Sequence, residues 1–193
     1  LALAHGSKVV EFGPGWGVLT VQLALCGYDV TAVDINPAML DVVARQAARQ
    51  EVEVHTVESD MLCFEPDGQL DAAIFFESFH HCFDFVDLLE RLAGQLTPRG
   101  VVALLAEPIG PVPYPWGLRL DGLSLWSIRR EGWCELGFST PFFEQLVSRS
   151  GLEATRHRSA SSRLCDLWVL RRMSAVENAR RPTRFFRPQR RVT

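Results

Sequence analysis

The residues of this 193-residue chain that point most clearly to chemistry are a cluster of glycines and the carboxylates near it. Gly13, Gly15 and Gly17 alternate with other residues shortly after Glu11. Glycines let the backbone turn sharply and let a ligand approach it without a Cβ in the way. A helix that begins at such a turn presents unpaired N–H groups and a positive field. The cluster therefore predicts a site for a carboxylate or a phosphate.

A second carboxylate lies one predicted strand further along the chain. Asp34 ends that strand, 17 residues beyond Gly17. In a β-α-β unit, a carboxylate at this place accepts two hydrogen bonds from a ribose diol bound across the first turn. The glycine cluster and Asp34 together predict an adenosine-type ligand. A dinucleotide fingerprint needs G-x-G-x-x-G, whereas here the third glycine comes one residue early, which argues against NAD.

The elements that position these residues are predicted from the pattern of apolar side chains. Apolar runs predict strands over 8–12, 29–34, 53–56, 70–76, 101–106, 152–157 and 164–170. Helical spacing and capping residues predict helices over 18–26, 37–50, 85–96 and 140–150, and residues 97–100 predict a turn. Alternating strands and helices predict a doubly wound α/β sheet, in which ligands bind at the carboxyl ends of the strands.

The segment Glu11–Gly17 resembles the first motif of the class I S-adenosylmethionine-dependent methyltransferases, an acidic residue followed by G-x-G-x-G. The resemblance extends over residues 8–170, because the family's seven strands, with a last antiparallel strand, fit the predicted order. It implies a Rossmann-like methyltransferase domain over residues 1–170, with a seven-stranded and mostly parallel sheet. It also implies S-adenosylmethionine as the cofactor and S-adenosylhomocysteine as the product.

The resemblance assigns further residues to the cofactor. In this family an acidic residue that ends the second strand holds the ribose, which falls on Asp34, and Ile35 beside it lies against the adenine. An acidic residue after the third strand accepts from the adenine amino group, which matches Asp60, and Met61 then packs on the ring. Glu77, after the fourth strand, lines the methionine end. Without the family, Asp60 is interpreted as a solvated loop carboxylate.

Candidate catalytic residues follow the fourth and fifth predicted strands. The sulfonium of such a cofactor is already an activated methyl donor, so the protein mainly aligns the acceptor and excludes water. A hydroxyl acceptor also benefits from a general base. His80 and His81 resemble the family's His-His pair, and His81, nearer the next helix, is preferred. Glu107 leaves the fifth strand at the same face. The alternative is that the histidines only hydrogen-bond the loop backbone.

Residues 107–138 form an insertion that is too long for an idle loop and carries four prolines and three of the five tryptophans. We expect it to act as a lid or as a wall for the substrate. Flat rings and guanidinium groups such as Tyr114, Trp116 and Arg119 suit a sugar ring, a planar aromatic or a phosphorylated small molecule. The alternative is a small satellite core of tryptophans with solvated arginines.

Composition and charge narrow the class of protein. The apolar stretches are far shorter than the ~18 residues of a membrane span, and five scattered cysteines without a C-x-x-C pair predict a reduced, cytoplasmic protein. Residues 171–193 hold eight arginines and one glutamate, whereas the first 170 residues hold 12 basic against 22 acidic side chains. We therefore expect 171–193 to be a mobile basic tail, and a nucleic-acid partner is disfavoured. The sequence shows no clear cluster of carboxylates, so no metal is predicted.

These observations predict methyl transfer to a small-molecule acceptor, a sugar or another polar metabolite, at a hydroxyl oxygen. Methylation of a nucleobase amino group is disfavoured, because the fourth strand ends in Phe-Phe-Glu-Ser and not in the Asn/Asp-Pro-Pro-aromatic motif of those enzymes. Two alternatives stay open: a cofactor-binding partner module without turnover, and a nucleic-acid methyltransferase that uses the basic tail. The start at Leu1, without a basic leader, predicts that the natural N-terminus lies further upstream.

Overall fold

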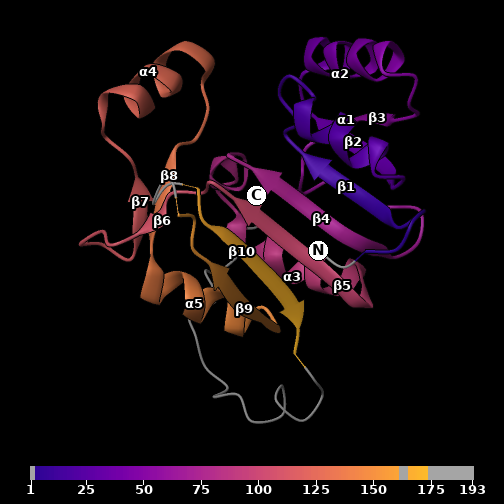
Figure 1. The fold of residues 1–193 in the computed structure, drawn as a ribbon. Helices are drawn as coiled ribbons and strands as arrows, with labels where there is room; N and C mark the ends of the chain where they lie inside the picture. Colours follow the sequence, from indigo (N-terminus) through magenta and orange to yellow (C-terminus); the bar gives the residue numbers. More distant parts are fainter. Residues whose placement is uncertain (1–2, 161–164, 174–193) are drawn as a thin grey trace, which may run out of the picture.

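The computed structural model describes residues 3–160 and 165–173 (Figure 1). The first part of the chain alternates strands and helices in the order β1 (Lys8–Phe12), α1 (Val18–Leu25), β2 (Asp29–Asp34), α2 (Pro37–Arg49) and β3 (His55–Glu58). The central part contains β4 (Leu70–Phe76), the short 3-10 helix η1 (Phe79–His81), α3 (Phe85–Gln95) and β5 (Leu96–Leu105). The last part contains β6 (Ile109–Gly110), β7 (Trp116–Leu118), α4 (Gly122–Glu131), β8 (Leu136–Ser139), α5 (Thr140–Arg149), β9 (Leu152–His157) and β10 (Leu167–Arg172).

The large sheet has the strand order β3-β2-β1-β4-β5-β10-β9. Neighbouring strands from β3 to β5 pair in parallel, whereas β10 pairs antiparallel with both β5 and β9. The chain builds outward from β1 to β3 on one side and from β4 onward on the other, so the order reverses between β1 and β4. Ligands in doubly wound folds bind at the carboxyl ends of the strands at such a reversal. The predicted seven-stranded, mostly parallel α/β sheet is confirmed.

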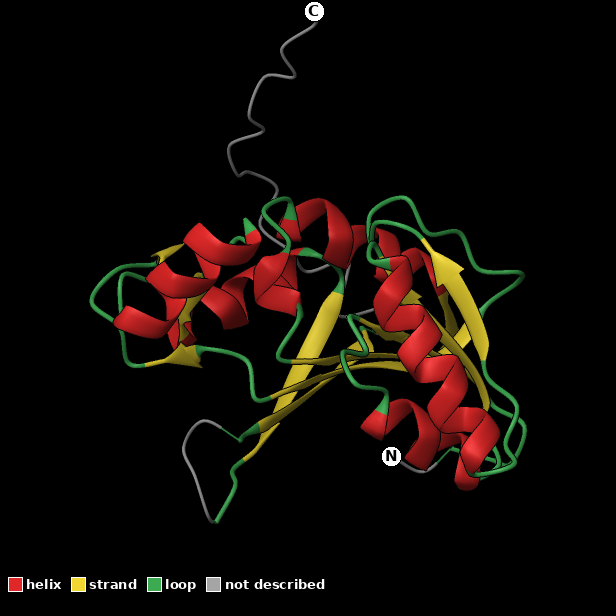
Figure 2. Ribbon diagram, turned by 90° about the horizontal axis from the view of Figure 1, so that it is seen from above, coloured by secondary structure: helices red, strands yellow, loops and turns green. Residues whose placement is uncertain are grey.

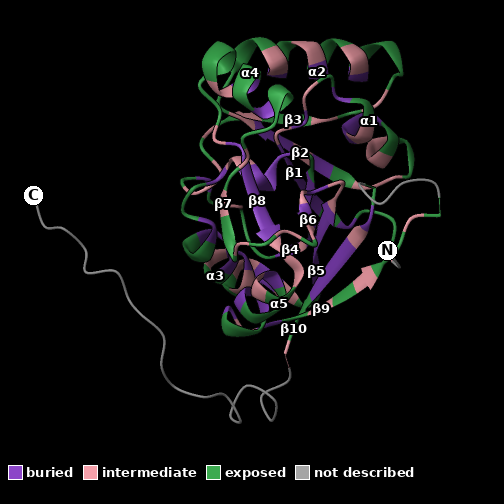
Figure 3. Cartoon of the chain, turned by 90° about the vertical axis from the view of Figure 1, so that its left-hand side faces the viewer, coloured by how far each residue is buried: buried purple, intermediate pink, exposed green. Residues whose placement is uncertain are grey.

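Helices cover both faces of this sheet (Figure 2). On one face, Leu19 and Leu23 of α1 pack against a buried cluster that includes Ile74, and α2 packs its own apolar residues against Ala32. On the other face, α3 and α5 join the largest buried cluster of the molecule, to which Phe75 belongs. Strands buried on both faces are why the sequence reads as continuous apolar runs. Figure 3 shows these strands as the buried layer between more exposed helices.

Local signals account for the helix boundaries. The side chain of Asn36 accepts a hydrogen bond from the N–H of Ala38 at 3.0 Å, and Pro37 occupies the first helical position of α2. Gly27 follows α1 with a φ of 81°, in the left-handed region that favours glycine after a helix. At α5 the N-cap is Ser139, whose hydroxyl accepts from the N–H of Phe142 at 3.4 Å, and the helix begins at Thr140.

Three strand boundaries differ from the prediction. The third strand covers His55–Glu58 instead of 53–56, because its register is decided by pairing with β2, where Val33 lies opposite Val57. The predicted turn at 97–100 lies within β5 as an irregularity, where Leu70 pairs with Leu96 and Ala72 already pairs with Val101. The last strand runs through Arg172, so the domain extends past the predicted limit of 170.

The insertion has secondary structure that the sequence did not predict. Its strands are two to four residues long, too short to show a periodic pattern, and they form a small sheet in the order β6-β8-β7. Phe138 of β8 joins this sheet to the domain core, because its ring lies 5.1 Å from that of Phe85 and 5.9 Å from that of Phe79. α4 lies apart from the large sheet, above the small one (Figure 1).

Some predictions concern residues outside the described part of the chain. Most of the predicted basic tail, residues 174–193, lies outside the described residues, as does Leu164 at the predicted start of the last strand. None of the described helices has the length and apolar character of a membrane-spanning segment.

Candidate active site

The glycine turn connects β1 to α1 at the point where the strand order reverses. Gly13, Gly15 and Gly17 have φ angles of 65°, 52° and 75°, in the region that side chains other than glycine rarely adopt. A Cβ at residue 13 would lie 2.8 Å from the Cβ of Ser78, so the turn is packed directly against the loop after β4. A Cβ at residue 15 would meet nothing within 4 Å, so the backbone of Gly15 borders open space. The turn therefore presents bare backbone to a ligand.

Glu11 supports this turn from inside the protein. Its carboxylate is buried and accepts a hydrogen bond from the hydroxyl of Thr20 in α1. Burial raises the pKa of the Glu11 carboxyl from 4.5 to about 7, against the opposing effect of the Thr20 hydrogen bond. The side chain thus links β1 to α1 beneath the glycines.

The residues predicted to hold an adenosine lie along the same edge. Asp34 ends β2 and accepts from the N–H of Asn36 at 2.8 Å, and burial raises the pKa of its carboxyl. Ile35, directly after it, leaves 64% of its surface exposed. The N–H of Ser59 donates to the carbonyl of Asp34 at 3.0 Å, which brings the segment after β3 alongside. In that segment Asp60 accepts from the N–H of Leu62 at 2.7 Å.

Two of the predicted residues differ in burial. Met61 is half-buried and packs against the largest core cluster, while Glu77 is exposed at the end of β4. Glu77 has a φ of 50°, and Ala106 at the end of β5 has a φ of 56°. Left-handed conformations outside glycine cost energy and cluster at functional sites. Both strained residues follow the carboxyl ends of the neighbouring strands β4 and β5, and Ser78, next to Glu77, packs against the glycine turn.

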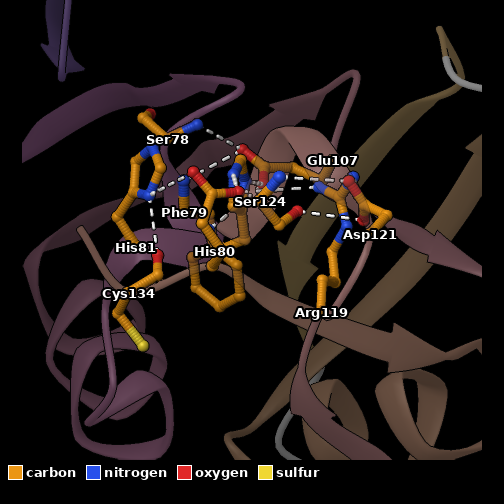
Figure 4. Close-up of polar contacts among 10 residues, drawn as sticks. Ser78, Phe79, His80, His81, Glu107, Arg119, Asp121, Ser124 and Cys134 are labelled. Carbon is orange, nitrogen blue, oxygen red and sulfur yellow. Dashed lines mark hydrogen bonds and ion pairs between the residues drawn. The ribbon is translucent and has the colours of Figure 1, made fainter. Parts of the chain in front are cut away.

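Glu107 holds the loop that carries the histidines (Figure 4). Its buried carboxylate accepts from the N–H groups of Ser78, Phe79 and His80 at 2.9, 2.9 and 3.1 Å, and it contacts Nδ1 of His80 at 2.7 Å. A carboxylate that accepts this many hydrogen bonds is a strong anchor for a short turn such as η1. Glu107, predicted as catalytic, therefore acts on the loop geometry through η1 and His80.

The two histidines have different surroundings. His80 is buried, and Nε2 of its ring lies 3.6 Å from Oε2 of Glu135, opposite the contact with Glu107. His81 is half-buried, and its Nδ1 lies 2.8 Å from the carbonyl oxygen of Cys134. A carbonyl oxygen only accepts, so Nδ1 of His81 carries the proton and Nε2 carries the lone pair. Burial, followed by the neighbouring His80 ring, lowers the pKa of His81.

The structure adds Glu135, which the sequence analysis missed. Glu135 is buried between β8 and the histidines, and Oε2 of Glu135 lies 3.7 Å from Nη1 of Arg119. Arg119 also pairs with Asp121 at 3.1 Å. Trp133 lies beside His81, with ring centroids 5.2 Å apart. No motif marks Glu135 in the sequence, because it belongs to an insertion without a periodic pattern, whereas Trp133 is one of the insertion's three tryptophans.

The three predicted substrate residues have different surroundings. Arg119 reaches the histidine site through Glu135, whereas Trp116 packs edge-on against Phe83 and Phe85. Tyr114 lies over Gly137 in the small sheet.

A cavity of about 460 Å³ runs along α4. It is lined by Gly122, Leu125, Trp126, Arg129 and Arg130. The insertion's tryptophans stay 38–57% exposed, and its buried apolar residues are Ile109, Leu136 and Phe138.

A doubly wound sheet with a glycine turn after β1, a carboxylate after β2 and an antiparallel strand β10 is the architecture of the class I S-adenosylmethionine-dependent methyltransferases. Residues 9–100 match a family described as "Methyltransferase domain". Residues 9–100 therefore belong to a methyltransferase domain of this class, and the cofactor of this class is S-adenosylmethionine. The described residues fit that cofactor, because the backbone at Gly15 is open and Asp34 lies on the adjacent strand end.

Individual relatives agree with this assignment. A ubiquinone biosynthesis O-methyltransferase of Xanthomonas campestris is 31% identical over 101 residues, which are 51% of this chain and 42% of that protein. The chain spans less than half the length of the curated relatives it matches. Among solved structures, the CcbJ methyltransferase from Streptomyces caelestis has a TM-score of 0.69 and 18% identity, covering 90% and 86% of the two chains. The N-methyltransferase NodS from Bradyrhizobium japonicum has a TM-score of 0.59 and 16% identity, covering 89% and 80%.

Proposed function

We propose that the protein transfers a methyl group from S-adenosylmethionine to a hydroxyl oxygen of a small molecule. The observation that carries this proposal is the direct packing of the glycine turn against the loop that holds the histidines, with a Cβ at residue 13 only 2.8 Å from Ser78. The cofactor supplies an activated methyl group, so the chain's own task is to bind, align and exclude water.

The cofactor side of the site is formed by three strand ends. Gly13, Gly15 and Gly17 give the backbone turn, with Glu11 beneath it. Asp34 accepts from the ribose and Ile35 lies against the adenine. Asp60 and Met61 complete the adenine side, and Glu77 lies at the methionine end. These roles follow the resemblance, and the common edge on which the residues lie supports them.

The acceptor side lies between the histidine loop and the insertion. His81 offers an unprotonated Nε2 while its Nδ1 donates to the carbonyl of Cys134, so its ring has the tautomer of a general base. Glu107 positions that loop, and Tyr114, Trp116 and Arg119 form part of the surrounding insertion. Oxygen as the acceptor atom is supported by the O-methyltransferase that the Xanthomonas campestris name describes.

Cofactor binding is tested by calorimetric titration with S-adenosylhomocysteine, with NAD as a parallel ligand. We expect S-adenosylhomocysteine to bind and NAD to give no signal. Asp34→Ala removes the acceptor for the ribose hydroxyls and should weaken binding at least about tenfold, because hydrogen bonds to a charged group contribute about 1.5–3 kcal/mol each. Glu53→Ala, an exposed carboxylate ahead of β3 at the opposite end of the parallel strands, is the matched control and should bind as the unmodified chain does.

Methyl transfer is tested by screening hydroxylated acceptors for release of S-adenosylhomocysteine. His81→Ala should abolish release while the affinity for S-adenosylhomocysteine stays unchanged. Binding without release for every acceptor class would favour a partner module without turnover. Binding of NAD in place of S-adenosylhomocysteine would contradict the proposal altogether.

A further inference from the structure

His80, His81 and Glu135 form a cluster of potential metal ligands at the acceptor end of the site. Each side chain offers one ligand atom, and these three atoms lie within 4.8 Å of one another. Two imidazoles and one carboxylate are a donor set found in catalytic zinc sites and in non-haem iron sites, where positions stay open for another ligand.

The hydrogen bond outside the cluster prepares the ring of His80 for this role. Glu107 is a carboxylate and only accepts, so the contact of 2.7 Å assigns the ring proton of His80 to Nδ1. Nε2 of a neutral His80 ring then carries the lone pair, and ligating histidines characteristically donate their other N–H to a carboxylate in this way. In His81 the nitrogen that faces Glu135 is Nδ1, which lies 4.0 Å from Oε1 of Glu135 and 2.8 Å from the carbonyl oxygen of Cys134. Ligation through Nδ1 therefore exchanges the hydrogen bond to Cys134 for the ion and leaves the ring proton on Nε2.

The contact between His80 and Glu135 has the separation of two ligands on one ion. Nε2 of His80 lies 3.6 Å from Oε2 of Glu135, which is too long for a hydrogen bond. Two atoms that each lie about 2.1 Å from a tetrahedral ion are roughly 3.4 Å apart. With a neutral ring, a lone pair therefore faces a buried carboxylate across a gap of the size that a cation fills.

The charges around the gap are predominantly negative. Glu107 and Glu135 are both buried, and each faces His80. The guanidinium of Arg119 lies nearby, with Nη1 3.7 Å from Oε2 of Glu135, but its Nη2 pairs with Asp121 at 3.1 Å. Asp121 and Glu135 thus share one guanidinium, and a divalent ion balances the remaining negative charge.

We propose that His80, His81 and Glu135 bind a divalent first-row transition metal ion. The role of the ion rests on the proposed function: a hydroxyl bound at an open position loses its proton more readily, and His81 is then a ligand instead of the base. Metal binding itself does not depend on methyl transfer. The sequence analysis predicted no metal, because Glu135 is 54 residues from His81 and lies in an unpatterned insertion.

The test is equilibrium dialysis of the chelator-treated full chain against Co²⁺, with visible absorption to report the ligand environment. We expect one Co²⁺ per chain with intense visible bands. Glu135→Gln and His81→Asn should each weaken binding at least about tenfold. The double variant His55→Gln/His157→Gln removes two exposed histidines and should bind Co²⁺ as the unmodified chain does.

Calorimetry with S-adenosylhomocysteine on the same samples separates this inference from the proposed function. If the chain binds S-adenosylhomocysteine but no Co²⁺, the metal site is overturned. Co²⁺ binding that survives both Glu135→Gln and His81→Asn would also overturn it, because the ion would lie elsewhere. Co²⁺ binding without S-adenosylhomocysteine binding would support the metal site while contradicting the proposed function.

Discussion

At the scale of single residues, buried carboxylates organise the site. Glu107 anchors the histidine loop with four contacts, and Glu11 anchors the glycine turn through Thr20. Burial is costly for a charged group unless hydrogen bonds stabilise the charge. Glu107 receives several donors, whereas Glu11 has one described side-chain donor, and burial dominates its pKa.

Glu11 is expected to make the stability of the protein depend on pH. Its folded pKa of about 7 lies above its ordinary value of 4.5, so the folded state holds the proton more tightly. This stabilisation amounts to about 3 kcal/mol. It is fully present below pH 4.5 and is lost as the pH rises through 7. Urea unfolding of the unmodified chain and of Glu11→Gln at pH 5 and pH 8 measures it.

Comparing the unmodified chain with Glu11→Gln isolates the contribution of Glu11 from those of the other groups that titrate. The free energy of unfolding of the unmodified chain should fall between pH 5 and pH 8 by about 3 kcal/mol more than that of Glu11→Gln. Glu53→Gln, which changes an exposed carboxylate, should follow the unmodified chain. Equal pH slopes for the unmodified chain and Glu11→Gln would show that Glu11 titrates normally.

At the scale of elements, the connection between β1 and α1 is constrained by the backbone conformation of its glycines and by its close approach to the loop after β4. Gly13 combines a φ of 65° with a distance of 2.8 Å between an added Cβ and Ser78. Gly94 in α3 has neither constraint, since its added Cβ would meet nothing within 4 Å. The two glycines form a matched pair for substitution.

Gly13→Ala should lower the free energy of unfolding by about 2 kcal/mol, because alanine is strained at positive φ and its Cβ displaces the loop after β4. It should also weaken S-adenosylhomocysteine binding. Gly94→Ala should instead raise the free energy of unfolding by up to about 1 kcal/mol, because alanine is the better helix former. Urea unfolding and calorimetry on both variants provide the measurement, and an unchanged Gly13→Ala would mean that the turn tolerates a side chain.

At the scale of the whole molecule, the insertion and the domain share one core. Leu136 and Phe138 of the small sheet belong to the same buried cluster as Phe79, Phe85 and Phe143. Three of the five tryptophans lie in the insertion, so tryptophan fluorescence reports mainly on that part, whereas far-UV circular dichroism reports on the whole fold. The shared core predicts that both signals change together.

Phe138→Ala should therefore destabilise the entire molecule by about 3–5 kcal/mol, the usual cost of removing a buried phenylalanine side chain. We expect fluorescence and circular dichroism to give coincident urea transitions in both the unmodified chain and the variant. Trp126→Ala, which removes a side chain that is 57% exposed on α4, should leave the midpoint nearly unchanged. A fluorescence transition at lower urea than the circular dichroism transition would indicate an independently unfolding insertion.

The sequence by itself determined the sheet, the glycine turn and the carboxylates that follow the strands. These features follow local rules: continuous apolar runs for buried strands, Asn36-Pro37 for a helix start, and a fixed distance from Gly17 to Asp34 across one helix. Local rules also predicted that the histidine loop lies at the ligand edge, because it directly follows β4.

Only the tertiary structure decided how the histidine loop and the insertion meet. Contacts of Glu107 with residues 78–80, of His81 with Cys134 and of Glu135 with Arg119 join distant parts of the chain. The insertion's strands are too short to leave a pattern, and the register of β3 depends on its partner strand. Contacts between segments far apart in sequence depend on how all elements pack, so no local spacing encodes them.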